Sequence, residues 1–155
     1  MKRALAMSML SVALLLCGIS KVLAEDAVVE AQRLFKQYTE MERAFDPSLG
    51  ELFAPNAIIK DVRVYQDGQT KTITWSGNDY KQVLRAGLPV AKIRNDMNNY
   101  SAMTYTRDGA NVRIKGTRHS LLKKYSAPFE LVVAPSSANG KTTWKIIEEL
   151  TQSEL

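Results

Sequence analysis

Apolar side chains recur at steps of three and four along the chain from Asp26 to Phe45. This spacing predicts an amphipathic helix with a single buried face. Beyond it, short apolar runs are separated by turn sequences such as Asp67-Gly68 and Asp108-Gly109, which are typical of β-hairpins. A long helix followed mostly by strands must bury its apolar face against one side of a sheet.

The whole chain is predicted to hold three helices and six strands. The helices cover residues 26–45, 47–53 and 77–88, and the third ends at Gly87-Leu88-Pro89. Asp46 and Ser76 are the predicted N-caps of the second and third helices. The strands cover residues 57–65, 70–75, 100–106, 111–119, 125–134 and 141–150. This order favours an α+β fold: a strongly curved, mixed or antiparallel sheet of about six strands, wrapped by a long N-terminal helix and two shorter helices.

Residues 1–24 have the layout of a signal peptide. Lys2 and Arg3 precede an apolar run from Ala4 to Ile19, and Val22-Leu23-Ala24 suits the cleavage site. We therefore expect a single exported domain, residues 25–155, in a bacterial periplasm, with no stable membrane span after cleavage. Secretion, lipid attachment at Cys17 and an uncleaved anchor are the alternatives.

The composition excludes several classes of function. Cys17 is the only cysteine, so the mature domain has no disulfide, no thiol nucleophile and no thiolate metal site. Three basic residues leave with the signal, which reduces the formal net charge from +5 to +2 and gives no support for nucleic-acid binding. His119 is the only histidine, and no metal-ligand spacing surrounds it. We predict neither a metal nor a cofactor.

Two stretches carry a resemblance to a known family. The element order, the sequence LFAPNAIIKD at residues 52–61 and the sequence GKTTWKIIEE at residues 140–149 resemble the nuclear transport factor 2-like superfamily. This superfamily includes SnoaL-like cyclases, steroid delta-isomerases and scytalone dehydratase. The resemblance covers almost all of residues 25–152. It implies a cystatin-like cone whose bent sheet and helices enclose a cavity, on a fold that hosts enzymes, binding proteins and assembly domains.

The alternation of side chains along each strand predicts which residues face the cavity. The first strand is ambiguous, and the resemblance places Asp61 at the pocket mouth, where relatives hold a general base. It also places Tyr38 within one position of a donor tyrosine. A second acid donor is missing, because Ala127 and Phe129 stand on the matching face. Arg118 is predicted to point inward and His119 outward, unless a bulge shifts the register.

In the last strand, Trp144 and Glu148 are predicted to face inward, while Ile147 and Glu149 face outward. Asp61, Arg118 and Glu148 form either a self-neutralising buried network or an anion-binding site. The strand aromatics form either a pocket or plain core. The candidate catalytic residues are Asp61 and Tyr38, and the candidate ligand-binding residues are Phe35, Tyr38, Asp61, Trp75, Tyr100, Arg118, Phe129, Trp144 and Glu148.

The sequence favours an exported, non-catalytic domain that binds a small hydrophobic or anionic molecule, or docks another exported protein, in its cone. The alternative is a cofactor-free isomerase, dehydratase or cyclase with Asp61 as general base. The resemblance also implies a possible homodimer through the outer face of the sheet.

Overall fold

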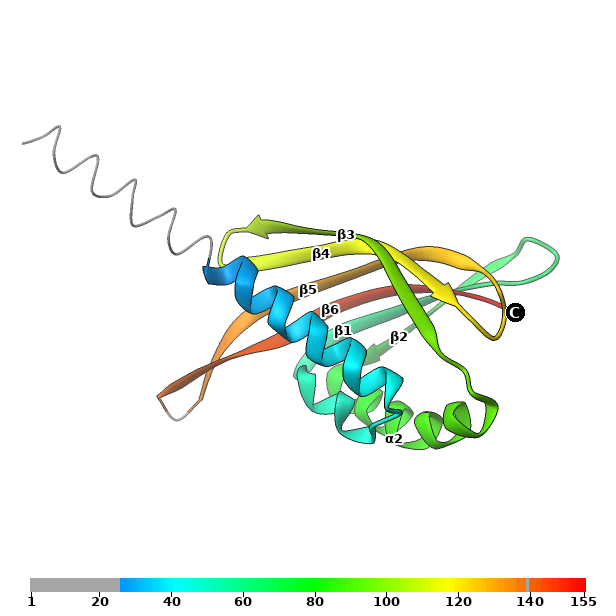
Figure 1. The fold of residues 1–155 in the computed structure, drawn as a ribbon, viewed down its shortest axis with the longest axis horizontal. Helices are drawn as coiled ribbons and strands as arrows, with labels where there is room; N and C mark the ends of the chain where they lie inside the picture. Colours follow the sequence, from blue (N-terminus) through cyan, green and yellow to red (C-terminus); the bar gives the residue numbers. More distant parts are fainter. Residues whose placement is uncertain (1–25, 139) are drawn as a thin grey trace, which may run out of the picture.

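The computed structural model describes residues 26–138 and 140–155 of the chain. The predicted signal peptide, residues 1–24, lies outside the described residues. Within the described ranges, no helix is long and apolar enough to cross a membrane. Figure 1 shows a bent sheet with the N-terminal helix lying across one of its faces and further helical segments at one end.

The six strands form one sheet in the order β2-β1-β6-β5-β4-β3. β1 and β6 pair in parallel, and every other neighbouring pair is antiparallel. The predicted α+β class with a curved, mixed sheet is therefore confirmed. The strands are β1 Phe53–Val64, β2 Thr70–Ser76, β3 Asn98–Asp108, β4 Asn111–Ser120, β5 Ser126–Ala138 and β6 Lys141–Glu154.

The hairpin turns form where the sequence predicted them. Gly68, between β1 and β2, has a φ of 80°, and Gly109, between β3 and β4, has a φ of 62°. Glycine enters this left-handed region without the steric cost that a Cβ imposes. The two tight turns fix the register of both hairpins.

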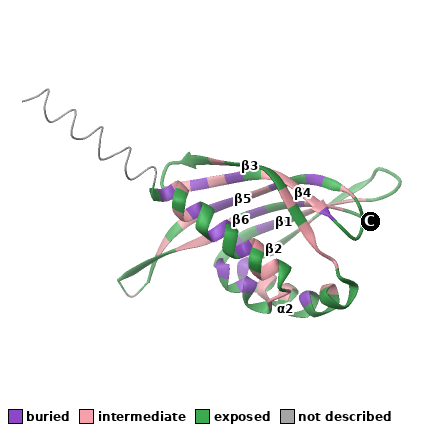
Figure 2. Cartoon of the chain, viewed as in Figure 1, coloured by how far each residue is buried: buried purple, intermediate pink, exposed green. Residues whose placement is uncertain are grey.

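The N-terminal helix spans residues 26–43 and lies with its apolar stripe on the sheet. Figure 2 shows buried residues along the side of this helix that faces the strands. The predicted spacing of three and four is confirmed, since the fully buried members of the stripe are Ala27, Ala31, Leu34, Phe35 and Tyr38. The helix is therefore held to the sheet by packing rather than by its intrinsic propensity.

A short 3₁₀ helix, η1 Pro47–Leu52, follows the N-terminal helix, and the helix α2 Gly77–Arg94 follows β2. Both predicted N-caps are confirmed: Ser48 N–H donates to Asp46 Oδ1 at 2.9 Å, and Asp79 N–H donates to Ser76 Oγ at 3.1 Å. The backbone N–H groups at a helix start lack intrahelical partners, and these side chains supply acceptors.

The predicted end of α2 at Gly87-Leu88-Pro89 is wrong, because the helix continues to Arg94. Proline removes one backbone hydrogen bond from a helix interior but does not forbid a further turn. The extension is capped by Asn95, whose left-handed conformation lets its N–H reach the carbonyls of Ala91 and Lys92. The added turn brings Ala91 to the open end of the cone.

Aromatic rings fill the space between the N-terminal helix and the sheet. Phe35 packs on Tyr100 at a ring-centroid distance of 5.5 Å and on Phe129 at 6.0 Å. Tyr38 packs on Phe53 at 6.5 Å, and Phe53 continues to Tyr80 at 5.1 Å. Mostly edge-on and tilted contacts of this kind stabilise a core beyond simple area burial. The deep part of the cone is therefore packed core.

The strand β6 changes face at Ile147. Its register against β5 shifts between Ile146 and Glu148, so that Ile147 is an extra residue in β6. A β-bulge of this kind reverses the side-chain alternation beyond it. Ile146 and Glu149 are buried, whereas Glu148 and Leu150 are exposed. The predicted inward direction of Glu148 and outward direction of Glu149 are both wrong for this reason.

Two glycines of α2 give a matched test of this packing. A Cβ at Gly77 would overlap the carbonyl oxygen of Ala54 in β1, whereas a Cβ at Gly87 would meet nothing within 4 Å. We expect Gly77→Ala to lower the free energy of unfolding by about 2 kcal/mol or more, because backbone must move. Gly87→Ala is expected to raise it by up to about 1 kcal/mol through helix propensity. Urea denaturation of both variants measures the difference, and a neutral Gly77→Ala would contradict the close contact of α2 with β1.

Candidate functional site

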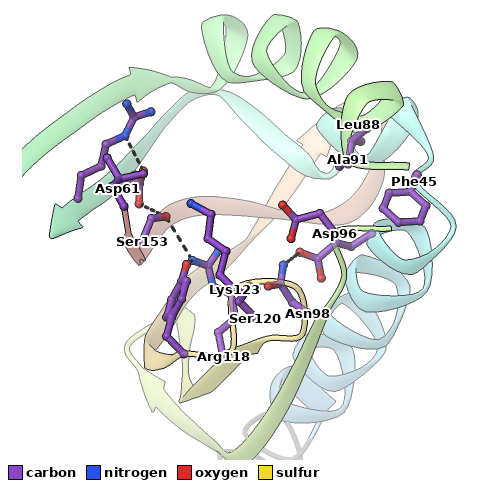
Figure 3. Close-up of a pocket in the computed structure, with 14 residues that line it drawn as sticks. Phe45, Asp61, Leu88, Ala91, Asp96, Asn98, Arg118, Ser120, Lys123 and Ser153 are labelled. Carbon is purple, nitrogen blue, oxygen red and sulfur yellow. Dashed lines mark hydrogen bonds and ion pairs between the residues drawn. The ribbon is translucent and has the colours of Figure 1, made fainter. Parts of the chain in front are cut away.

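A cavity of about 370 Å³ lies at the end of the cone that the aromatic core leaves open. Figure 3 shows side chains from the N-terminal helix, α2, the sheet and the β4–β5 loop converging on it. Its volume falls in the range of about 300–1,000 Å³ that is typical of small-molecule sites. Its lining residues are Glu42, Phe45, Asp61, Arg63, Leu88, Ala91, Asp96, Asn98, Arg118, Ser120, Lys123, Tyr125, Ser153 and Leu155.

Arg118 enters the cavity from β4 and is partly buried. All of its hydrogen bonds to described residues come from Nη2, which donates to the carbonyl oxygen of Gln152 at 2.6 Å, to Tyr125 Oη at 3.1 Å and to Ser153 Oγ at 3.4 Å. Its Nε is buried and has no hydrogen-bond partner among the described residues. A guanidinium has five N–H donors, so several of them remain without an acceptor.

Arg118 also lacks a direct counter-charge. In the described part of the chain, no carboxylate forms an ion pair with it. Burial lowers the pKa of its guanidinium, but Tyr125, Tyr100, Tyr38 and Glu149 all act to raise it, and the net pKa is raised. Arg118 therefore stays charged, and the predicted self-neutralising network with Asp61 and Glu148 does not form as direct ion pairs.

Glu149 lies below the cavity, in the core, and is only 2% exposed. Tyr80 Oη donates to its Oε1 at 3.3 Å, while its Oε2 is buried and has no hydrogen-bond partner within residues 26–138 and 140–155. Burial raises the pKa of this carboxyl to about 8, against a smaller lowering by the charge of Arg118. At neutral pH Glu149 therefore keeps its proton, and it does not neutralise Arg118.

Glu42 lines the cavity from the last turn of the N-terminal helix. Asn98 Nδ2 donates to its Oε1 at 2.9 Å, and Tyr100 Oη donates to its Oε2 at 2.9 Å. Burial raises the pKa of Glu42, and these two hydrogen bonds oppose the rise. Each oxygen still has accepting capacity, because a carboxylate offers about four acceptor positions.

Asp61 lines the mouth of the cavity, and its side chain is 13% exposed. It accepts hydrogen bonds from Ser153 Oγ at 2.8 Å, from Arg63 Nε at 3.2 Å and from Thr151 Oγ1 at 3.4 Å. Ser153 thus links Asp61 to Arg118, as Figure 3 shows. Tyr38 is buried in the aromatic core and does not line the cavity. The structure therefore does not bring the two candidate catalytic residues together.

Phe45 forms part of the cavity wall from an unusual backbone position. It follows the N-terminal helix with a φ of 54°, and its N–H donates to the carbonyl of Glu42 while Asp46 N–H donates to that of Met41. This is a Schellman-type helix end, in which the left-handed residue is usually glycine. A phenylalanine there bears a steric cost of about 1–2 kcal/mol. It places an aromatic ring where glycine would leave none.

The other predicted ligand-binding residues lie away from the cavity. Phe35, Tyr100 and Phe129 are packed together in the core. Trp75 and Trp144 are partly buried and pack against that core. Glu148 is exposed, beyond the bulge. Of the predicted set, the structure brings only Asp61 and Arg118 to the cavity.

Sequence reasoning missed several cavity residues, and one of them had a signal. Glu42 stands four positions after Tyr38 and three before Phe45, on the buried side of the helix. A carboxylate within an apolar stripe marks a polar contact at that end of the helix. Lys123 comes from a loop, and nothing in its neighbours indicates its direction. Glu149 was predicted to face outward, because nothing in the sequence indicates the bulge in β6.

His119 lies on the face of β4 opposite Arg118, as the alternation predicted. Its two ring nitrogens make hydrogen-bond contacts with Ser101 Oγ at 2.6 Å and Ser126 Oγ at 2.7 Å on the neighbouring strands. Across residues 26–138 and 140–155, no group of three or more His, Cys, Asp and Glu side chains is placed to hold a metal ion.

The protonation of Glu149 gives a pH-dependent stability. The unfolded carboxyl loses its proton near the ordinary pKa of 4.5 and the folded one near 8, so the folded state binds more protons between these values. The contribution of Glu149 to the free energy of unfolding must then fall as pH rises from about 4.5 to 8, by at most about 1.4 kcal/mol per pH unit.

Between pH 4.5 and 8, we expect the free energy of unfolding to fall less steeply with pH in Glu149→Gln than in the unmodified chain, because glutamine has no proton to lose. Urea denaturation at unit steps from pH 5 to pH 9 measures it. Glu148→Gln is the matched control on the exposed neighbour and should leave the slope unchanged. Equal slopes for Glu149→Gln and the unmodified chain would show that Glu149 is already ionised in the fold.

Comparison with known proteins gives a fold but no close relative. No protein-family model matches the chain, and a search of curated proteins finds no match. Solved structures do match. An NTF2-like protein with a cystatin-like fold from Novosphingobium aromaticivorans has a TM-score of 0.60 at 10% identity, over 86% of each chain. An NTF2-like protein of unknown function from Pseudomonas putida has a TM-score of 0.57 at 12% identity, over 81% of this chain and 85% of that one.

An enzyme-type structure is among the matches. A scytalone dehydratase-like protein from Novosphingobium aromaticivorans has a TM-score of 0.52 at 15% identity, over 84% of this chain and 85% of that one. Structural similarity at such low sequence identity shows the fold of the chain only. Its chemistry must be argued from the residues of the site. The resemblance expected from the sequence is confirmed at the level of fold. The chain has the nuclear transport factor 2-like, cystatin-like cone fold.

Proposed function

We propose that this protein is an exported domain that binds a small anionic molecule, without turnover, in the cavity at the open end of its cone. The observation that carries the proposal is Arg118, a partly buried cation that lines a cavity and has no ion-pair partner among the described residues. Buried charges are normally paired, because desolvation of an isolated ion is costly. A bound anion would supply the missing partner.

The hydrogen bonds of Arg118 support an anion site. Tyr125, Ser153 and the Gln152 carbonyl hold the guanidinium through Nη2 and leave its other donors free of partners in the described chain. The guanidinium held in this way keeps its Nη1 group to donate charge-assisted hydrogen bonds to a carboxylate. The lining also holds Arg63, which pairs with Asp61, and Lys123, which forms no ion pair with a described residue.

The neutral state of Glu149 supports the same conclusion. An ionised Glu149 would offset the positive charge of Arg118. Because the pKa of Glu149 is raised to about 8, the carboxyl is protonated at neutral pH and does not do so. The positive charge of Arg118 therefore acts on the cavity rather than on a buried neighbour.

A cofactor-free proton-transfer enzyme is a second candidate, and the position of Asp61 in the cavity favours it. That hypothesis pairs a general base with a donor beside the reacting carbonyl. Tyr38, the candidate donor, lies in the core, and three donors already occupy the oxygens of Asp61. Binding without turnover is better supported.

Arg118→Gln is expected to weaken the binding of small carboxylates about tenfold or more, because a charged hydrogen-bond partner is lost. Isothermal titration calorimetry with 4-methylpentanoate and phenylacetate measures the affinity. Arg118→Lys keeps the charge without the planar fork and should give an intermediate affinity. Arg113→Gln is the matched control, since Arg113 lies on the same strand but pairs with Asp108 and Glu130.

Circular dichroism of each variant separates loss of binding from loss of fold. Equal affinities for Arg118→Gln and the unmodified chain would contradict the proposed role of Arg118. The absence of saturable binding by every carboxylate tested would contradict the function itself.

Export is tested independently of binding. We expect the chain purified from its own host to begin at Glu25, after removal of residues 1–24. Intact-mass spectrometry reads this mass directly, and a full-length chain would contradict cleavage.

A further inference from the structure

The cavity has two chemically different sides. Arg118 and Lys123 project from β4 and from the β4–β5 loop, whereas Glu42 and Asp96 project from the N-terminal helix and from the segment after α2. Figure 3 shows Arg118 and Lys123 on one side of the open space and Asp96 on the other. Asp61 and Arg63, which pair with each other, also line the cavity. Glu42 and Arg118 are close enough for their charges to interact, yet they do not form a direct ion pair. The space between them is left for a third group.

The acidic side is built to accept hydrogen bonds. Asn98 and Tyr100 hold the two oxygens of Glu42 from β3, which fixes the plane of the carboxylate. The acceptor positions that remain on Glu42 suit a donor that reaches it from the cavity. An ammonium group has three donors and no acceptor, and it is the natural complement of such a site.

A third part of the lining is apolar. Phe45, Leu88 and Ala91 come from the end of the N-terminal helix and from α2, and Figure 3 shows them at the same end of the cavity. None of them can bind a charged group, but together they offer a surface for a short apolar chain. Phe45 holds this place although its backbone position favours glycine.

We infer that the ligand is a small zwitterion, an amino acid with an apolar side chain, whose carboxylate binds Arg118, whose ammonium binds Glu42 and whose side chain packs on Phe45, Leu88 and Ala91. This inference rests on the proposed anion-binding function and adds to it the cationic group and the apolar arm. The opposed charges across a cavity with no direct ion pair between Glu42 and Arg118 carry it.

Three molecules that share one apolar arm test the inference on the unmodified chain. Leucine carries both charged groups, 4-methylpentanoate lacks the ammonium group, and 3-methylbutylamine lacks the carboxylate. We expect calorimetry at pH 7 to show leucine binding at least tenfold more tightly than either of the others. This comparison needs no variant, so it stands even if a substitution in the cavity prevents folding.

Glu42→Gln assigns the second contact. It should bring the affinity for leucine down to that for 4-methylpentanoate without lowering the affinity for 4-methylpentanoate, because only the ammonium group reaches Glu42. Glu148→Gln removes an equal charge from the outer face and should change neither affinity.

The outcomes separate this inference from the proposed function. Equal binding of leucine and 4-methylpentanoate, lost together in Arg118→Gln, would overturn the zwitterion and leave the anion site intact. Failure of both to bind, or binding that Arg118→Gln does not change, would overturn the anion site and the zwitterion with it. An unchanged preference for leucine in Glu42→Gln would overturn the assigned role of Glu42.

Discussion

The contact between the N-terminal helix and the sheet determines where this protein can hold anything. Phe35 and Tyr38 project from the helix into rings contributed by β1, β3 and β5, and these aromatic side chains fill the deep part of the cone. A bent sheet closed by a helix would otherwise enclose a buried apolar cavity. Because aromatic side chains of the helix occupy the deep part of the cone, the cavity lies at the open end, where many of the lining residues are polar. The chemistry of the site follows from this position.

The electrostatics of the site follow from unequal burial. Glu149 is buried in the core, where burial disfavours the ionised carboxylate and the group stays protonated. Arg118 lies at the boundary between core and cavity and keeps its charge. Glu42 is held by two donors and serves as an acceptor. Three ionisable groups within one end of a small domain thus have three different roles. Their depth and hydrogen-bond partners, rather than their residue types, decide those roles.

The sequence predicted the parts of the fold that depend on local spacing. The helix over residues 26–43, the caps at Asp46 and Ser76 and the turns at Gly68 and Gly109 are set by neighbours within a few positions. The α+β class followed from the order of these elements, which left open whether the sheet is mixed or antiparallel. The end of α2 was missed, because Pro89 costs one hydrogen bond and Asn95 provides a cap beyond it.

The site was harder to predict, since it depends on register. Regular alternation correctly placed Arg118 on the inner face, because no bulge in β4 separates it from its buried neighbour Ile114. Alternation left the first strand ambiguous, and the family resemblance placed Asp61 at the cavity. The same rule failed in β6, where one extra residue at Ile147 exchanged Glu148 for Glu149. Alternation also could not say which inward aromatics pack together, because that depends on how closely the helix approaches.

At Phe45, the residue that would best stabilise the chain differs from the residue that forms the cavity wall. A glycine at this helix end would relieve the backbone and favour folding, and it would also remove one wall of the cavity. Selection for stability alone would therefore erode the site at this position, while selection for a ligand would preserve a strained residue. Among related sequences, a large side chain at the position of Phe45 would mark chains that form this cavity. A glycine there would mark chains that share the fold but lack this part of the cavity wall.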